Sequence, residues 1–267
     1  MRVNLIAEIG WNHMGDMELA KEMIQAAKKN GADFCKFQTW SEKKLKPGPW
    51  DTDGRREIYK QAELTEEKHH VLKKICDNLK IEFLTSVFNI KHLTFVSSVN
   101  SKTIKIPSHE VYNLVLIDKA TELFDTVLVS TGAATWDEIK KIANLKNKNK
   151  IVLMHCVSAY PCNLENINFP KLDKLKNLSD QIGYSGHYSG IDDALVAMTM
   201  GATYIEKHFT TNNDLPGRDN KFAILPNLFN QIARFRDNLK KMSIDRGLEL
   251  QDCEKDIYNN YRGRWSK

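Results

Sequence analysis

Eight short apolar segments, separated by segments with the spacing of amphipathic helices, constrain the fold of this chain more than any other feature. Each has the length of a buried strand and ends near polar or turn-forming residues. The predicted strands span residues 3–9, 33–38, 81–87, 102–106, 126–130, 150–156, 181–185 and 203–209. Strands that alternate with helices form parallel sheets, and eight is the number that closes a TIM barrel. The sequence therefore predicts an α/β fold, a single-domain (β/α)8 TIM barrel.

Segments of helical period lie between these strands. The predicted helical segments span residues 17–31, 64–80, 89–100, 111–124, 135–146 and 190–201. Thr135 begins the sequence TWDE, the pattern of a capping box, which marks the start of one of them. The connection at 41–64 is unusually long, and long connections after barrel strands usually form part of an active-site wall. We expect a barrel domain at residues 1–245 and a polar, basic C-terminal tail at 246–267.

Composition limits the class of partner and the compartment. The net charge of +5 is modest, and no basic stripe interleaved with aromatic residues suggests nucleic acid. No apolar run approaches the ~18 residues that would span a membrane, and the apolar start of the chain is too short for a signal peptide. The five cysteines are odd in number and show no CxxC spacing. Reduced thiols and a cytoplasmic location are the prediction.

Polar and charged side chains follow nearly all the predicted strands. In a barrel the carboxyl ends of the strands meet on one rim, where active sites lie. One such residue is readily structural, but eight ends that converge in this way favour a site. The strand-end residues are Glu8, Asn12, His13, Lys36, Gln38, Thr85, Ser86, Phe88, Lys105, Ser108, Glu110, Ser130, Thr131, His155, Ser158, Tyr160, Ser185, His187, Glu206 and His208.

Cations and hydroxyls form one group within this set, suited to a carboxylate and a phosphate. Its members are Lys36, Lys105, Ser86, Ser108 and Ser185.

Two histidines form a second group. His187 and His208 lie on neighbouring strands, so both imidazoles can reach one divalent metal and leave positions open. Two nitrogen ligands without thiolates suit Mn²⁺, Co²⁺, Zn²⁺ or Fe²⁺, and residue type does not choose among them. Glu8, Glu110 and Asp219 are then free to bind a polyhydroxy substrate or to transfer protons.

Six blocks of the chain resemble the sialic acid synthases in order and spacing, within residues 3 to 240. The blocks are AEIGWNHMGDMELAKEMIQAAKKNGADFCKFQT, KIPSHE, LVSTGAAT, MHCVSAYP, GYSGHYSGID and IEKHFTTNNDLPGRDNKF. The resemblance implies a transferase that condenses phosphoenolpyruvate with N-acetylmannosamine or a related amino- or deoxy-sugar, giving a nonulosonic acid and phosphate. It also implies a TIM barrel, a homodimer and a divalent metal, with Mn²⁺ favoured and Mg²⁺, Co²⁺ or Zn²⁺ as alternatives.

The resemblance also assigns roles to residues. It implies that phosphoenolpyruvate binds Lys36, Ser86, Lys105, Ser108, Ser158 and Ser185. It implies that the sugar contacts Glu8, Gln38, Phe88, Tyr160 and Asp219, and that His187 and His208 hold the metal. Glu110 would lie between the two substrates, and Glu110, Glu8 and Lys105 would be catalytic.

The chain departs from the family pattern in three ways. We expect it to lack the C-terminal antifreeze-like domain that contacts the N-acetyl group in relatives. The usual SDH at the first metal histidine is SGH here, so Gly186 removes a carboxylate beside His187. The usual threonine of the third strand and asparagine of the sixth are Ser86 and Ser158.

Two other functions stay open from the residues alone. A metal-dependent sugar isomerase or aldolase would turn over without phosphoenolpyruvate, and a catalytically idle barrel would bind a sugar or partner subunit. Lys36, Lys105 and Lys207 sit where a Schiff-base lysine could act, but such a reaction would give the paired histidines no role. Strand alternation predicts that Lys207 points away from the site, toward the helices or solvent.

Overall fold

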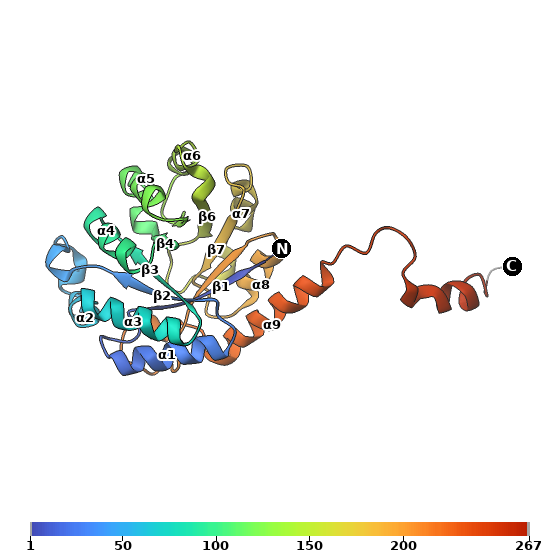
Figure 1. Ribbon diagram of the computed structural model, residues 1–267, viewed down its shortest axis with the longest axis horizontal. Coiled ribbons are helices and arrows are strands. Elements are labelled where there is room, and N and C mark those ends of the chain that lie inside the picture. Colours follow the sequence, from blue (N-terminus) through green and yellow to red (C-terminus); the bar gives the residue numbers. More distant parts are fainter. Residues whose placement is uncertain (1, 266–267) are drawn as a thin grey trace.

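Eight parallel strands close into a barrel in the computed structural model, which describes residues 2–265 (Figure 1). The strands are β1 (Asn4–Gly10), β2 (Phe34–Thr39), β3 (Glu82–Val87), β4 (Thr103–Ile106), β5 (Thr126–Ser130), β6 (Ile151–Cys156), β7 (Ile182–Gly186) and β8 (Tyr204–His208). Because β1 pairs with β8 as well as with β2, the sheet has no open edge. The TIM barrel is confirmed, and each predicted strand differs from the observed one by at most one residue at either end.

Helices surround the barrel on its outer face (Figure 1). They are α1 (Met17–Lys29), α2 (Arg55–Ala62), α3 (Glu66–Asn78), α4 (Ile90–Val99), α5 (Leu114–Leu123), α6 (Trp136–Ile142), α7 (Phe169–Leu175), α8 (Asp192–Thr199) and α9 (Pro226–Met242). The six predicted helical segments contain α1, α3, α4, α5, α6 and α8. The capping box is confirmed. The Thr135 side chain accepts a hydrogen bond from the backbone N–H of Glu138, and the Glu138 carboxylate accepts one from the backbone N–H of Thr135. The predicted segments do not include α2, α7 and α9. The first of these lies within the long 41–64 connection, and the other two each begin with a proline in their first turn.

An apolar layer fills the interior of the barrel below the strand ends. It consists of Ile6, Phe34, Leu84, Leu128, Val152 and Met154, all buried. Side chains along a strand alternate between its two faces, so the residue two positions further on also faces the interior. That step leads from this layer to Glu8, Lys36, Ser86, Ser130 and Cys156. The register of the apolar layer therefore selects the polar side chains of the upper barrel.

The chain beyond α9 leaves the barrel. Residues 243–265 run away from it and are exposed (Figure 1). Short helical turns lie at Asp252–Glu254 and Ile257–Tyr261. None of the helices within residues 2–265 has the length and apolar character needed to cross a membrane.

His13 lies behind the strand ends and not at the rim, where we expected it. Its side chain is buried with its ring 5.9 Å from that of Phe37, and its Nδ1 accepts a hydrogen bond from the Gly15 N–H at 3.0 Å. Burial, with a contribution from the Lys68 ammonium, lowers the pKa of His13 to about 4. The native state therefore holds this imidazole neutral at pH values where an exposed histidine is charged.

We expect His13 to make the protein less stable as the pH falls. The unfolded chain takes up this proton near pH 6.5 and the native state only near pH 4. The unfolded state thus gains protons first, and stability falls across this window by up to about 3 kcal/mol. Urea unfolding of the wild type and of His13→Gln between pH 6.5 and 4.5 measures this difference. The variant should show the shallower pH dependence, and equal slopes would contradict the assignment.

Candidate active site

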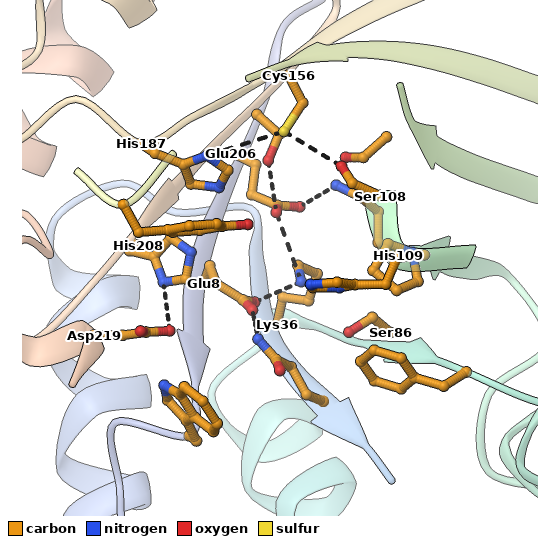
Figure 2. Close-up of a pocket in the computed structure, with 18 of the residues that line it drawn as sticks. Glu8, Lys36, Ser86, Ser108, His109, Cys156, His187, Glu206, His208 and Asp219 are labelled. Atoms are coloured by element: carbon orange, nitrogen blue, oxygen red, sulfur yellow. Dashed lines mark hydrogen bonds and ion pairs between the residues drawn. The ribbon is translucent and has the colours of Figure 1, made fainter. Parts of the chain in front are cut away.

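A pocket opens at the carboxyl end of the barrel and draws side chains from all eight strands or the turns that follow them (Figure 2). Its volume is about 930 Å³, counted with its open mouth. Most of the predicted site residues line it, namely Glu8, Lys36, Gln38, Ser86, Phe88, Lys105, Ser108, Tyr160, Ser185, His187, His208 and Asp219. The structure therefore brings the predicted anion, sugar and metal residues into one cavity.

Two predicted site residues do not line the pocket. Glu110 lies in the turn after β4, where its carboxylate accepts a hydrogen bond from the Asn113 amide at 3.0 Å. His109 lines the pocket beside it. Ser158 lies just behind the wall, and a Cβ built on Gly132 would come within 2.4 Å of its Oγ.

Strand alternation corrects part of the predicted rim. Thr85 points out of the barrel and its hydroxyl lies 2.8 Å from that of Thr39. His155 also points outward, with its Nε2 2.6 Å from the carbonyl of Ile167. Its neighbour Cys156 faces the pocket instead, and we did not predict it. The signal was available, because Cys156 lies two residues after the interior-facing Met154.

Four charged side chains form the floor of the pocket. The Lys36 Nζ lies 2.7 Å from Glu8 Oε2 and 3.6 Å from Glu206 Oε1. The Lys105 Nζ lies 2.8 Å from Glu206 Oε2. The Gln38 amide donates to Glu8 Oε1 at 2.7 Å. Acid and base therefore alternate across β1, β2, β8 and β4, in the order Glu8, Lys36, Glu206 and Lys105.

Glu206 is the shared anion of this floor. Burial opposes its ionisation, but the ammonium groups of Lys105 and Lys36 outweigh burial and lower its pKa to about 2. The Ser185 hydroxyl also donates to it at 3.1 Å. Burial instead raises the pKa of Glu8, and Lys36 offsets only part of that effect. The floor thus contains one carboxylate that stays charged and one that protonates more readily.

His187 and His208 lie on one side of the pocket with their ring centroids 5.4 Å apart (Figure 2). The His187 Nδ1 lies 2.7 Å from the carbonyl of Val157, which can only accept, so Nδ1 donates and Nε2 carries the lone pair of the neutral ring. The His208 Nδ1 is buried without a hydrogen-bond partner, and the nearest Asp219 oxygen is 3.6 Å away. Burial and the neighbouring His187 lower the pKa of His208 well below its usual range. His208 is therefore a neutral imidazole with a free lone pair.

These features fit a divalent metal held by two imidazole nitrogens. A metal-ligating histidine usually donates its other ring nitrogen to a carbonyl or carboxylate, as His187 does to Val157. Within residues 2–265, no group of three or more His, Cys, Asp or Glu side chains is arranged to hold a metal. Any further ligands would come from substrate or water, which leaves the open positions that a catalytic site needs.

The mouth of the pocket carries two arginines that sequence reasoning missed. Arg55 begins α2 within the long 41–64 connection, and its guanidinium pairs with Asp53 at 2.5 Å. Arg218 lies in the connection between β8 and α9, where it is exposed. Across residues 2–265 its guanidinium forms no hydrogen bond or ion pair. The predicted contribution of the long connection to the wall is confirmed, since Tyr59 of α2 also lines the pocket.

Together the fold and the pocket define a (β/α)8-barrel enzyme with a buried charged floor and a histidine pair above it. The sequence pattern of the NeuB family matches residues 23–246. The chain belongs to the NeuB family, which bears out its resemblance to the sialic acid synthases.

Relatives of known name agree with this placement. An N,N'-diacetyllegionaminic acid synthase of Legionella pneumophila is 34% identical over 87% of this chain and 71% of its own length. A second one, from Campylobacter jejuni, is 33% identical over 90% of this chain and 79% of its own. A pseudaminic acid synthase of Helicobacter pylori is 34% identical over 82% and 69%. The solved sialic acid synthetase of Leptospira borgpetersenii has 29% identity and a TM-score of 0.87, over 99% of this chain and 93% of that one.

We expect Glu206 to hold the floor together. Its replacement by alanine would leave Lys36 and Lys105 buried without this shared counter-charge, and breaking a buried pair in this way typically costs about 3–5 kcal/mol. Urea unfolding measures the loss, with the exposed Glu165→Ala as a matched control expected to change stability by less than about 0.5 kcal/mol. Equal stability of the two variants would show that Glu206 is not the shared anion.

Proposed function

We propose that this enzyme condenses phosphoenolpyruvate with an aldose, N-acetylmannosamine or a related amino- or deoxy-sugar. The products are a sialic-acid-like 2-keto-3-deoxy sugar acid and phosphate. One observation carries the proposal: one side of the pocket presents two buried lysines and a set of serine hydroxyls, and the other side is rich in carboxylates. Such a pocket offers separate places for a small, highly charged anion and for a polyhydroxy acceptor.

The enolpyruvate side of the pocket follows β3 to β7. Its donors are Lys105, Ser86, Ser108 and Ser185, with Lys36 at the boundary with β2. A ligand carrying a carboxylate and a phosphate would share the ammonium groups that now face Glu8 and Glu206. Because these donors are buried and already held in place, little reorganisation is needed when negative charge arrives.

The acceptor side follows β8, β1 and β2. Glu8 and Gln38 already bond to each other, and Asp219 faces them from the loop after β8. Burial and the nearby Glu8 raise the pKa of Asp219 to about 7, so this group can give or take a proton near neutral pH. Phe88 and Tyr160 offer ring faces to the carbon skeleton of a sugar.

A divalent metal on His187 and His208, with Mn²⁺ favoured and Mg²⁺, Co²⁺ or Zn²⁺ as alternatives, would supply Lewis-acid polarisation of the acceptor aldehyde. The Val157 carbonyl orients the His187 ring, and the Asp219 carboxylate lies 3.6 Å from the His208 Nδ1. The Tyr160 ring lies 4.1 Å from that of His187 and limits access of water from that side.

The reaction balances with the groups present. Carbon 3 of phosphoenolpyruvate bonds to the aldehyde carbon, and the resulting alkoxide takes a proton, for which we assign Asp219 as donor. Water adds to carbon 2, and Glu8 is the carboxylate placed to accept its proton. The bond between carbon 2 and the phosphate oxygen then breaks, the new hydroxyl on carbon 2 becomes the keto group, and its proton leaves with the phosphate. The lysines hold the enolpyruvate by position and charge, which is electrostatic and not covalent catalysis.

An aldolase that uses a Schiff base is less well supported. Lys207 points into the helical layer, as predicted, and pairs there with Asp193 at 2.8 Å. Lys36 and Lys105 are each tied to a carboxylate. An isomerase would leave the lysine and serine cluster without a substrate group to bind.

A phosphate-release assay tests the proposed reaction. With phosphoenolpyruvate, Mn²⁺ and a panel of N-acetylmannosamine and its amino-deoxy relatives, we expect release that requires all three components. The Lys105→Ala variant should show a raised dissociation constant for phosphoenolpyruvate in calorimetric titration, with little change in metal content. No phosphate release with any sugar of the panel, from a protein shown to be folded, would contradict the function. An unchanged dissociation constant for phosphoenolpyruvate in Lys105→Ala would remove Lys105 from the anion site.

We expect Arg218 to contribute to acceptor binding. Arg218→Ala should raise KM for the aldose about tenfold, the loss of one charge-assisted hydrogen bond of about 1.4 kcal/mol, and leave KM for phosphoenolpyruvate unchanged. Arg234→Ala, an exposed arginine on α9, is the matched control. A rise in KM for phosphoenolpyruvate instead would place Arg218 on the other side of the pocket.

A further inference from the structure

Asp193 is a buried carboxylate outside the pocket, behind the strands that carry the histidine pair. It belongs to α8 and is 1% exposed. The Lys207 ammonium of β8 donates to its two oxygens at 3.0 and 2.8 Å, and the Tyr184 hydroxyl of β7 donates at 3.1 Å. The Ala194 N–H donates at 2.9 Å. One carboxylate thus connects α8, β7 and β8.

Lys207 extends this network to the loop after β7. Its Nζ also donates to the carbonyl of Tyr188 at 2.5 Å. Tyr188 directly follows His187, and Lys207 directly precedes His208. Because neighbouring residues of a strand face opposite sides, holding Lys207 outward also holds His208 inward. The outer network therefore fixes the backbone next to each histidine.

Gly186 gives Asp193 the space that it occupies. A Cβ built on Gly186 would lie 2.3 Å from Asp193 Oδ2 and 2.6 Å from a ring carbon of Tyr184. A carboxylate carried by residue 186 would therefore fall in the region that the Asp193 carboxylate now fills. Gly186 carries no carboxylate of its own, and α8 supplies one to the space behind it from outside the barrel.

We propose that Asp193 is a positioning residue for His187 and His208. Through Lys207 it sets the separation of the two imidazoles, and it does so from α8 in place of a side chain at residue 186. The network is buried and each carboxylate oxygen has at least two donors, so a shift of Asp193 would move the histidine-bearing segments. The inference rests on the proposed function only where it takes the histidine pair as a metal site.

Moving the carboxylate tests this role. We expect Asp193→Ala to weaken Mn²⁺ binding, measured by calorimetry and by the paramagnetic resonance of free Mn²⁺, by about 10- to 100-fold. The double variant Gly186→Asp with Asp193→Ala should recover most of that affinity, because the new carboxylate reaches the same region. Gly186→Asp alone should lose stability, since two carboxylates would compete for one space.

A second ion pair controls for general destabilisation. Asp33 pairs with Arg236 at 2.9 Å and accepts from the Leu5 N–H at the opposite end of the barrel. Asp33→Ala should lower the urea midpoint and leave Mn²⁺ affinity within about twofold of the wild type. If Asp193→Ala does not fold, Asp193→Asn keeps the shape and removes the charge, and it should weaken Mn²⁺ binding in the same direction.

The outcomes separate this proposal from the proposed reaction. Unchanged Mn²⁺ affinity in a folded Asp193 variant, or a folded double variant that recovers none of it, would overturn the positioning role alone. A wild type that binds no Mn²⁺ would overturn the role together with the metal site. The phosphate-release assay would still decide the condensation independently.

Discussion

Alternation of side chains along eight closed parallel strands is the constraint on which this structure depends. Each strand must send every second residue into the barrel and the others toward the helices. On β1 the interior-facing Ile6 is followed two residues later by the interior-facing Glu8, and on β2 Phe34 is followed in the same way by Lys36. The apolar layer of the barrel interior therefore lies directly below the charged floor. This arrangement keeps water away from one side of the charges and raises the strength of their interaction.

The same alternation explains how three consecutive ionisable residues can end one strand. Glu206 faces inward to Lys36 and Lys105, Lys207 faces outward to Asp193, and His208 faces inward again. If Glu206 and Lys207 shared one face, they would pair with each other and compete for the partners that each now has. On alternate faces Glu206 and Lys207 each have their own partner, so β8 belongs to two separate polar networks.

Much of the fold and part of the site could be predicted from the sequence, because both follow from local periodicity. Apolar runs located the strands, and the strand ends located residues such as Lys36 and His208. The errors arose where local pattern does not determine direction or distance. His155 was placed on the wrong face, although the alternation from Met154 could have corrected it. Arg218 depends on how a long connection folds back, which no periodicity encodes.

Asp193 shows a further limit of reasoning from motifs. A motif fixes the residue type at a position, whereas the physical requirement is for a charge at a point in space. Here the glycine at residue 186 leaves room for a carboxylate that arrives from α8, seven residues later in the chain. A carboxylate at residue 186 would fall in the same region, beside the outward ammonium of Lys207. A departure from a motif is therefore evidence of lost function only after the neighbouring elements have been searched for the missing group.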